Sequence, residues 1–212
     1  METLGILLGT VTRVKLMRLF LFNTDKTFSV AEIVTRIKTK EKEVKEEVSI
    51  LEKAGLIRKK VFFVHSEKKV GKKVVSFRKK EIGWYLNTSF VFLSQFQNLL
   101  TGSKLLKDEE ILKRLAHVGK LKLVILAGVF IQNWTSRVDI FVVGDNLKKN
   151  SLENIVRTLE SEIGREITYT YFETADFKYR LAMCDKLVRD VLDYPHNTIL
   201  DKLGESEMKK IR

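Results

Sequence analysis

Four residues in the middle of the chain have the spacing of a site for metal-assisted phosphoryl transfer. That chemistry would need a hydroxyl and carboxylates at their positions. Gly128 and Val129 follow an apolar run, and Arg137 and Asp139 precede a second one. A serine after the glycine would bind a phosphate oxygen, and acids at both 137 and 139 would hold divalent ions that neutralise developing charge. Here valine replaces the hydroxyl and a guanidinium replaces the first carboxylate. One carboxylate beside a fixed cation cannot hold two divalent ions.

The elements expected around these residues form an α/β unit over residues 120–212. Apolar or alternating runs predict strands at 121–127, 140–143, 166–172 and 198–200. Ser151 is predicted to cap a helix that Gly164 ends, and Thr174 is predicted to cap one long helix that reaches Val191. Alternating strands and helices in this order predict a small mixed sheet with helices packed on it.

Three blocks of this half resemble the minimal nucleotidyltransferase fold of the DNA polymerase beta superfamily. They are LKLVILAG at 121–128, RVDIFVVGD at 137–145 and GREITYTYFETADFKYRL at 164–181. In active members the resemblance implies a Gly-Ser turn that holds the triphosphate. It also implies two acids on the following strand that bind magnesium ions, and a third acid on a later strand.

The resemblance is incomplete at the positions that catalysis needs. Gly128 and Asp139 agree with the family pattern, whereas Val129 and Arg137 depart from it. The later strand offers threonines where the third acid would be. We therefore expect a degenerate domain with no catalytic residue, no metal and no cofactor.

Arg137 and Asp139 allow two interpretations. In the first they form an ion pair, at the surface or between domains, on a scaffold that has lost its chemistry. In the second, Arg137, the backbone of Gly128 and the hydroxyls of Thr135 and Ser136 bind a nucleotide phosphate without metal. The degenerate nucleotide site therefore comprises Gly128, Arg137 and Asp139, and a nucleotide is the ligand to test.

The whole chain has a formal net charge of +12, and the positive charge is concentrated in its first part. Residues 1–87 hold 20 basic and 10 acidic side chains, whereas residues 88–212 hold 19 and 17. Residues 58–80 alone hold ten basic side chains against Glu67. This density indicates a polyanionic partner, and a solvated, lysine-biased surface is the alternative.

Three helices and a two-stranded ribbon are predicted in this basic half. Helical periodicity places the helices at 12–22, 29–37 and 40–53, and extended segments at 58–64 and 74–77 flank a hairpin tip at 65–73. Ser29 and Glu32 have the spacing of a capping box at the start of the second helix. Gly55 follows the third helix at the position where glycine commonly ends one.

This order of elements resembles the winged helix-turn-helix of bacterial and archaeal transcriptional regulators. The resemblance is carried by TRVKLMRLFLFN at 12–23, FSVAEIVTRI at 28–37, VKEEVSILEKAGLI at 44–57 and WYLN at 84–87. It implies double-stranded DNA as the partner, with the third helix in the major groove and the ribbon along the phosphates.

Candidate DNA contacts follow from where the charges lie on these elements. The third helix offers Lys42 and Ser49 on its outward face, where Glu46 also lies, and Lys45 at the edge of that face. The ribbon offers Arg58, Lys59, Lys60, Lys68, Lys69, Lys72 and Lys73. Residues 40–53 also carry five glutamates against four lysines. A solvated helix with charge pairs four residues apart is therefore the alternative for the third helix.

Residues 88–119 are predicted to form a helical connector. Phe92, Phe96, Leu99 and Leu100 make an apolar stripe on its first helix, and a second helix is expected near residues 108–117. This stripe is expected to pack on one of the domains or on a second copy of the chain, forming a homodimer.

The sequence therefore predicts an α+β protein with a winged helix in residues 1–87, the connector, and a nucleotidyltransferase-like domain in 120–212. Cys184 is its only cysteine and its longest apolar run is too short to span a bilayer, so a cytoplasmic location without a membrane partner is expected. The leading hypothesis is a DNA-binding transcriptional regulator whose second domain serves dimerisation or ligand sensing. The alternatives are a divergent metal-dependent nucleotidyltransferase and an antitoxin-like, partner-binding protein.

Overall fold

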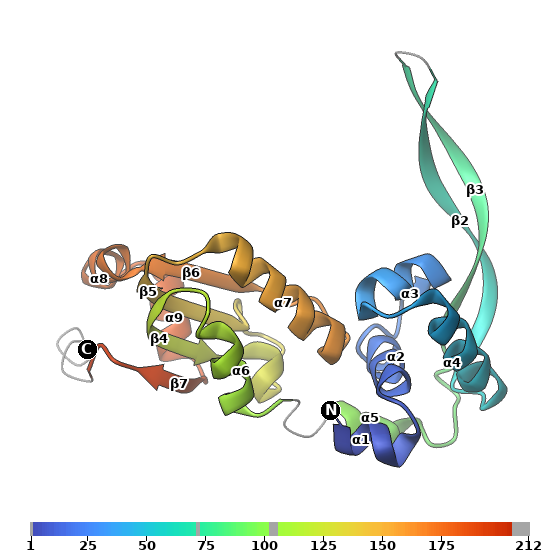
Figure 1. Cartoon of the computed structure of the whole chain (residues 1–212), viewed down its shortest axis with the longest axis horizontal. Coiled ribbons are helices and arrows are strands. Elements are labelled where there is room, and N and C mark those ends of the chain that lie inside the picture. Colours follow the sequence, from blue (N-terminus) through green and yellow to red (C-terminus); the bar gives the residue numbers. More distant parts are fainter. Residues whose placement is uncertain (1, 71–72, 102–105, 205–212) are drawn as a thin grey trace. The chain divides into compact units, whose positions relative to one another are not determined.

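The protein is a mixed α+β chain with two small sheets (Figure 1). The structure, a computed structural model, describes residues 2–70, 73–101 and 106–204. The chain divides into two compact units. The first comprises Met1–Thr101 with Ser161–Arg165, and the second comprises Gly102–Glu160 and Glu166–Arg212. The division falls inside the predicted connector, whose two helices belong to different units.

The helices of the first unit begin and end close to where local sequence signals place them. They are α1 (Glu2–Leu8), α2 (Val11–Phe22), α3 (Val30–Ile37), α4 (Glu41–Lys53) and α5 (Leu93–Thr101). The capping box of Ser29 and Glu32 is confirmed at the start of α3. Gly55 follows α4 with a φ of +82°, in the left-handed region that glycine adopts readily. Helix α1 was not predicted.

The sheet of the first unit is a long antiparallel ribbon joined by one short strand. The strands β1 (Thr27–Phe28), β2 (Ile57–Val70) and β3 (Lys73–Leu86) lie in the order β1-β3-β2. The predicted tip at 65–73 was too long, because β2 continues to Val70 and β3 starts at Lys73. Ladder hydrogen bonds join backbones and need no apolar side chains, so a lysine-rich segment can continue a ribbon.

The core of the first unit encloses the charged side chain of Arg18. Buried side chains of α2, α3, α4 and α5, among them Phe20, Ile33 and Leu100, make up this core. Arg18 is buried with them and donates from Nε to the carbonyl of Leu100 at 3.1 Å. It also donates from Nη1 to the carbonyl of Glu162 at 3.2 Å. Burial lowers the pKa of Arg18 to about 10, so its guanidinium stays charged at neutral pH.

The second unit is built on a four-stranded mixed sheet. The strands β4 (Lys120–Leu126), β5 (Ile140–Asp145), β6 (Tyr169–Glu173) and β7 (Asn197–Asp201) lie in the order β6-β5-β4-β7. Strands β5 and β6 are parallel, and the other two pairs are antiparallel. The helices are α6 (Asp108–Leu115), α7 (Lys149–Ile163), α8 (Thr174–Ala182) and α9 (Lys186–Asp193), with a 3-10 turn, η1, at Gly128–Ile131.

Three expectations for the second unit were wrong in detail. Helix α7 begins at Lys149, so Ser151 lies within its first turn, and β6 begins at Tyr169 instead of Glu166. The single long helix after Thr174 is two helices, because Asp185 accepts hydrogen bonds from the N–H groups of Leu187 and Val188 and starts α9. Both α8 and α9 cover the sheet face that presents Leu123, Phe141 and Val143.

Within the described ranges, every helix is too short or too polar to cross a lipid bilayer.

Candidate nucleic-acid interface and the pocket at Arg137

The outward face of α4 carries the three candidate base-contacting residues. Lys42, Lys45 and Ser49 are all exposed. The Lys45 ammonium lies 2.7 Å from the Glu41 carboxylate one turn earlier. An exposed pair of this kind contributes little stability and exchanges readily for another anion.

The glutamates of α4 mostly contact other elements of the first unit. Glu47 is buried and accepts from Arg13 Nε and Thr10 Oγ1, both at 2.7 Å. Glu43 accepts from the hydroxyl of Thr12 at 3.3 Å, and Glu52 accepts from Trp84 Nε1 at 2.8 Å. The acid count of the helix therefore overstates the negative charge on its outward face. Sequence reasoning missed these partners because they lie more than thirty residues away.

The ribbon presents basic side chains on both of its faces, at its base and near its middle. Arg58, Lys59 and Lys60 of β2 and Arg78, Lys79 and Lys80 of β3 are exposed. Lys59 Nζ lies 6.0 Å from the ring centre of Trp84, and Lys60 Nζ lies 5.2 Å from that of Tyr85. Because successive residues of a strand point to opposite faces, these stacked pairs hold one cation on each side of the ribbon.

The other four predicted ribbon contacts lie toward its tip. Lys68, Lys69 and Lys73 belong to the paired strands, and only their backbone is described. Lys72 lies outside the described residues.

One face of the ribbon also carries an exposed apolar stripe. Val61 is directly opposite Ile82, and Phe63 follows on the same face. All three side chains are exposed. The same face of the ribbon begins at the buried pair of Ile57 and Leu86, which belong to the core of the first unit. The stripe therefore lies on the face of the ribbon that packs on the core at its base. Sequence reasoning did not single it out.

Asp139 has a structural role at the start of β5. Its side chain is buried, and its two oxygens accept from the N–H groups of Val129 and Thr168, both at 2.8 Å. Its backbone N–H donates to the carbonyl of Thr168 at 2.7 Å. The carboxylate thus joins η1, β5 and the residue that precedes β6. Each carboxylate oxygen therefore accepts one backbone hydrogen bond, which leaves about half of the acceptor sites of the group for any other partner.

The structure brings Gly128 and Asp139 together and places Arg137 elsewhere. Gly128 has a φ of +51°, and a β-carbon there would lie 1.9 Å from Asp139 Oδ1. Arg137 instead pairs with Asp190 of α9, with Nε 3.1 Å from Oδ2. The interpretation of Arg137 and Asp139 as a mutual ion pair was therefore wrong, since each has its own partner.

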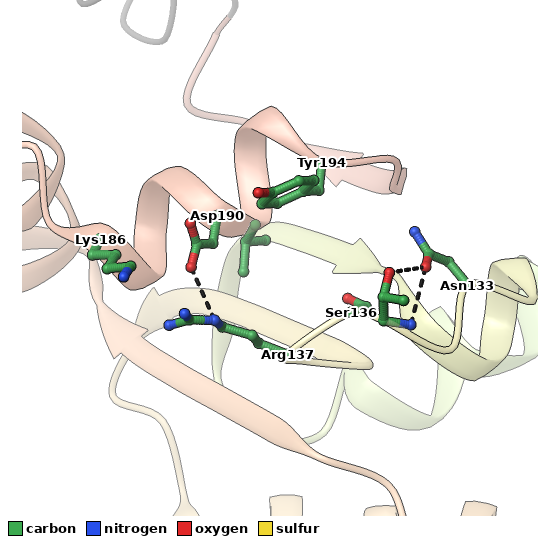
Figure 2. A pocket seen from close by; sticks show the side chains of 8 residues that line it. Asn133, Ser136, Arg137, Lys186, Asp190 and Tyr194 are labelled. Carbon is green, nitrogen blue, oxygen red and sulfur yellow. Dashed lines mark hydrogen bonds and ion pairs between the residues drawn. The ribbon is translucent and has the colours of Figure 1, made fainter.

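A pocket of about 320 Å³ surrounds Arg137 (Figure 2). It is lined by Asn133, Thr135, Ser136, Arg137, Lys186, Asp190, Val191 and Tyr194. Two cations, Arg137 and Lys186, face one acid, Asp190. Thr135 Oγ1 donates to Asn133 Oδ1 at 2.7 Å, and Ser136 Oγ donates to the carbonyl of Val138 at 2.8 Å. The charged side chains of the lining carry a net charge of +1, and the lining includes the predicted Arg137, Thr135 and Ser136 but not Gly128.

Among the described residues, no group of three or more His, Cys, Asp or Glu side chains is arranged to hold a metal ion. No protein-family model matches the chain, and neither a curated protein nor a solved structure shows detectable similarity to it.

Proposed function

We propose that this protein binds double-stranded DNA through α4 and the base of the ribbon, as a winged-helix regulator in the cytoplasm. Helices α2, α3 and α4 followed by the antiparallel ribbon have the order that the winged-helix resemblance predicts, with α1 in addition at the start. Strand β1 pairs with β3, and Trp84 of β3 bonds to Glu52 of α4. These links hold the ribbon and α4 in one fixed surface.

The observation that carries the proposal is the set of exposed cations at the base and near the middle of the ribbon. Six basic side chains lie within the described part of β2 and β3, and Glu81 is engaged by Lys79 at 2.9 Å. Cations held at this density neutralise phosphates and release counterions, which gives affinity without sequence choice. Base selection then falls to Lys42, Lys45 and Ser49.

Fluorescence anisotropy with unrelated duplexes, at salt concentrations from about 50 to about 300 mM, tests this function. Replacing Arg58, Lys59 and Lys60 with Gln should weaken binding to every duplex. It should also reduce the slope of log affinity against log salt by about 0.9 for each phosphate that is no longer neutralised. Replacing Lys120, Lys148 and Lys202 of the second unit with Gln removes the same charge and serves as the matched control. Equal weakening by both variants, or no binding by the unaltered chain at the lowest salt, would reject the proposal.

We further propose that the second unit is an inactive nucleotidyltransferase-like unit that senses a small anion. The bonds of Asp139 to two backbone N–H groups support inactivity, and the pocket at Arg137 supports sensing. Incubation with labelled nucleoside triphosphates and magnesium or manganese tests the first point. Metal-dependent transfer of label by the unaltered chain would favour the divergent enzyme instead.

A protein-binding role is the second candidate, and the apolar stripe of the ribbon favours it. Beside the stripe lies an open groove of about 600 Å³ between α3 and the ribbon, lined in part by Val30, Val34, Ile82 and Trp84. An antitoxin-like protein would use such a surface to hold a partner chain. Absence of duplex binding at low salt, together with capture of one stoichiometric protein partner that Phe63→Glu abolishes, would favour this candidate.

A further inference from the structure

Two uncharged stretches of the first unit meet on one exposed apolar surface. Residues 3–12 and 87–101 carry no charged side chain, in a chain of which 31% is charged. The predicted stripe of the connector divides here, because Leu100 and Phe96 pack on the core while Phe92 and Leu99 remain 56% and 46% exposed. Val91 is 80% exposed beside them.

Helices α1 and α4 extend this surface. Ile6 and Leu7 of α1 are 82% and 72% exposed, and Ile50 of α4 is 43% exposed. Together the six side chains offer on the order of several hundred Å² of apolar area, which is the size of the largest apolar patch on a typical monomer, and such patches are often functional. That area approaches the ~800 Å² that each partner of a standard interface buries.

The surface has a groove with a projecting aromatic ring beside it. The groove has a volume of about 300 Å³ and is lined mainly by apolar side chains, including Leu7, Ile50, Ala54 and Phe96. Phe90 also lines it, and the Phe92 ring packs against Phe90 with centroids 5.9 Å apart. Two copies related by a two-fold axis could contact each other here, because the ring of each copy would meet the groove of the other.

Charge decides in favour of a second copy as the occupant. Residues 1–87 have a net charge of +10, so two copies repel wherever their basic surfaces face each other. Residues 3–12 and 87–101 bring no charged side chain to a two-fold contact, and Arg13, the charged residue that lines the groove, pairs with Glu47 at 2.7 Å. A partner selected by electrostatics would instead meet the ribbon or the face of α4 that carries Lys42 and Lys45.

We propose that this apolar surface is a homodimer interface in which Phe92 of each copy enters the groove beside Ile50 of the other. The proposal places self-association in the first unit and does not depend on DNA binding. Because the contact is apolar, the dimer should persist as salt is raised, whereas charge-driven contacts weaken.

Sedimentation equilibrium of the full chain, at low and at high salt, provides the first test. The unaltered chain should be a dimer at micromolar concentration, and Phe92→Glu should weaken dimerisation at least tenfold. Phe63→Glu makes the same change at a ribbon residue that is 64% exposed, and it should leave the dimer intact. A monomeric unaltered chain, or dissociation by Phe63→Glu and not by Phe92→Glu, would overturn the proposal.

A cysteine cross-link tests the seating of Phe92 directly. In a Cys184→Ser background, a tagged Ile50→Cys chain is mixed with an untagged Phe92→Cys chain under mild oxidation. A mixed disulfide joining the two chains is expected, and a Tyr179→Cys chain, altered in the second unit, should not cross-link with either. Failure of the 50–92 pair to form a mixed disulfide in a sample that sediments as a dimer would overturn this seating.

Discussion

The carboxylate of Asp139 occupies the place where a β-carbon at position 128 would lie. The ideal β-carbon of residue 128 would stand 1.9 Å from Asp139 Oδ1, and that same oxygen accepts from the N–H of Val129 at 2.8 Å. The glycine and the aspartate that agree with the nucleotidyltransferase pattern therefore have a structural explanation. The turn needs the carboxylate for its N–H group, and the carboxylate needs a residue without a side chain beside it.

Asp139→Asn should destabilise the second unit. An asparagine can accept at one atom but presents an NH₂ group to the second backbone donor, so one buried N–H is left without a partner at a cost of about 3 kcal/mol. Each unit holds one of the two tryptophans, so urea unfolding followed by Trp134 fluorescence in a Trp84→Phe background reports on this unit. Asp193→Asn alters an exposed pair with Arg189 and should cost less than about 0.5 kcal/mol. Equal stability of the two variants would contradict the structural role.

Gly128→Ala should lower stability for two separable reasons. Its φ of +51° disfavours alanine by about 1 kcal/mol, and the overlap with Asp139 adds a larger cost. Gly55 has a φ of +82° with no atom within 4 Å of an added β-carbon, so Gly55→Ala measures the backbone cost alone. Removing the carboxylate with Asp139→Ala should relieve the overlap, giving a coupling of about 1–2 kcal/mol in a double-mutant cycle. Strict additivity would mean that the two residues do not contact each other.

Local signals were readable from the sequence, and long-range partners were not. The capping box at Ser29 and the glycine after α4 act within four residues, so their chemistry is complete in a short window. The bond between Arg13 and Glu47 spans 34 residues, and no periodicity distinguishes it from a solvated charge pair. The break before α9 did have a local signal in Asp185, which the apolar periodicity of residues 177–191 obscured.

The candidate site shows the same limit. The spacing of Arg137 and Asp139 predicted that they form an ion pair. In the structure Asp139 accepts hydrogen bonds from the backbone, and Arg137 pairs with Asp190, more than fifty residues later. A pattern defined by catalysis could not reveal that Gly128 and Asp139 serve the turn. Lys186 and Tyr194 joined the pocket only through the folding of α9.

The pocket at Arg137 should bind nucleotide phosphates in a way that Asp190 controls. Asp190→Asn releases the guanidinium from its 3.1 Å ion pair and removes the one acid of the pocket, so phosphate affinity should rise about tenfold, or about 1.4 kcal/mol. Arg137→Gln should abolish binding. Calorimetric titration with a nucleoside triphosphate, with and without magnesium, measures both effects.

A change at Arg189 provides the control for that titration, because Arg189 belongs to the same helix and pairs with Asp193 without lining the pocket. Arg189→Gln should leave the affinity unchanged. If neither the unaltered chain nor Asp190→Asn produces heat at millimolar nucleotide, the pocket is not an anion site.

Replacing Arg18 should unfold the first unit at lower urea concentration. Arg18→Met leaves the carbonyls of Leu100 and Glu162 without the donors that reach them at 3.1 and 3.2 Å, at a cost of about 3 kcal/mol. Trp84 fluorescence in a Trp134→Phe background reports on this unit. Lys26→Met, at an exposed position, should be nearly neutral and serves as the control.

The pH dependence of the Arg18→Met effect distinguishes the charge from simple packing. Burial lowers the pKa of Arg18 to about 10 from 12.5, so the group is protonated in both the folded and the unfolded state below about pH 9. The difference in unfolding free energy between the unaltered chain and Arg18→Met should therefore be constant from about pH 6 to about pH 9. Above about pH 10 the folded state releases this proton before the unfolded state does, so the difference should increase with pH. A difference that already changes between about pH 6 and about pH 8 would show that another titrating group is responsible.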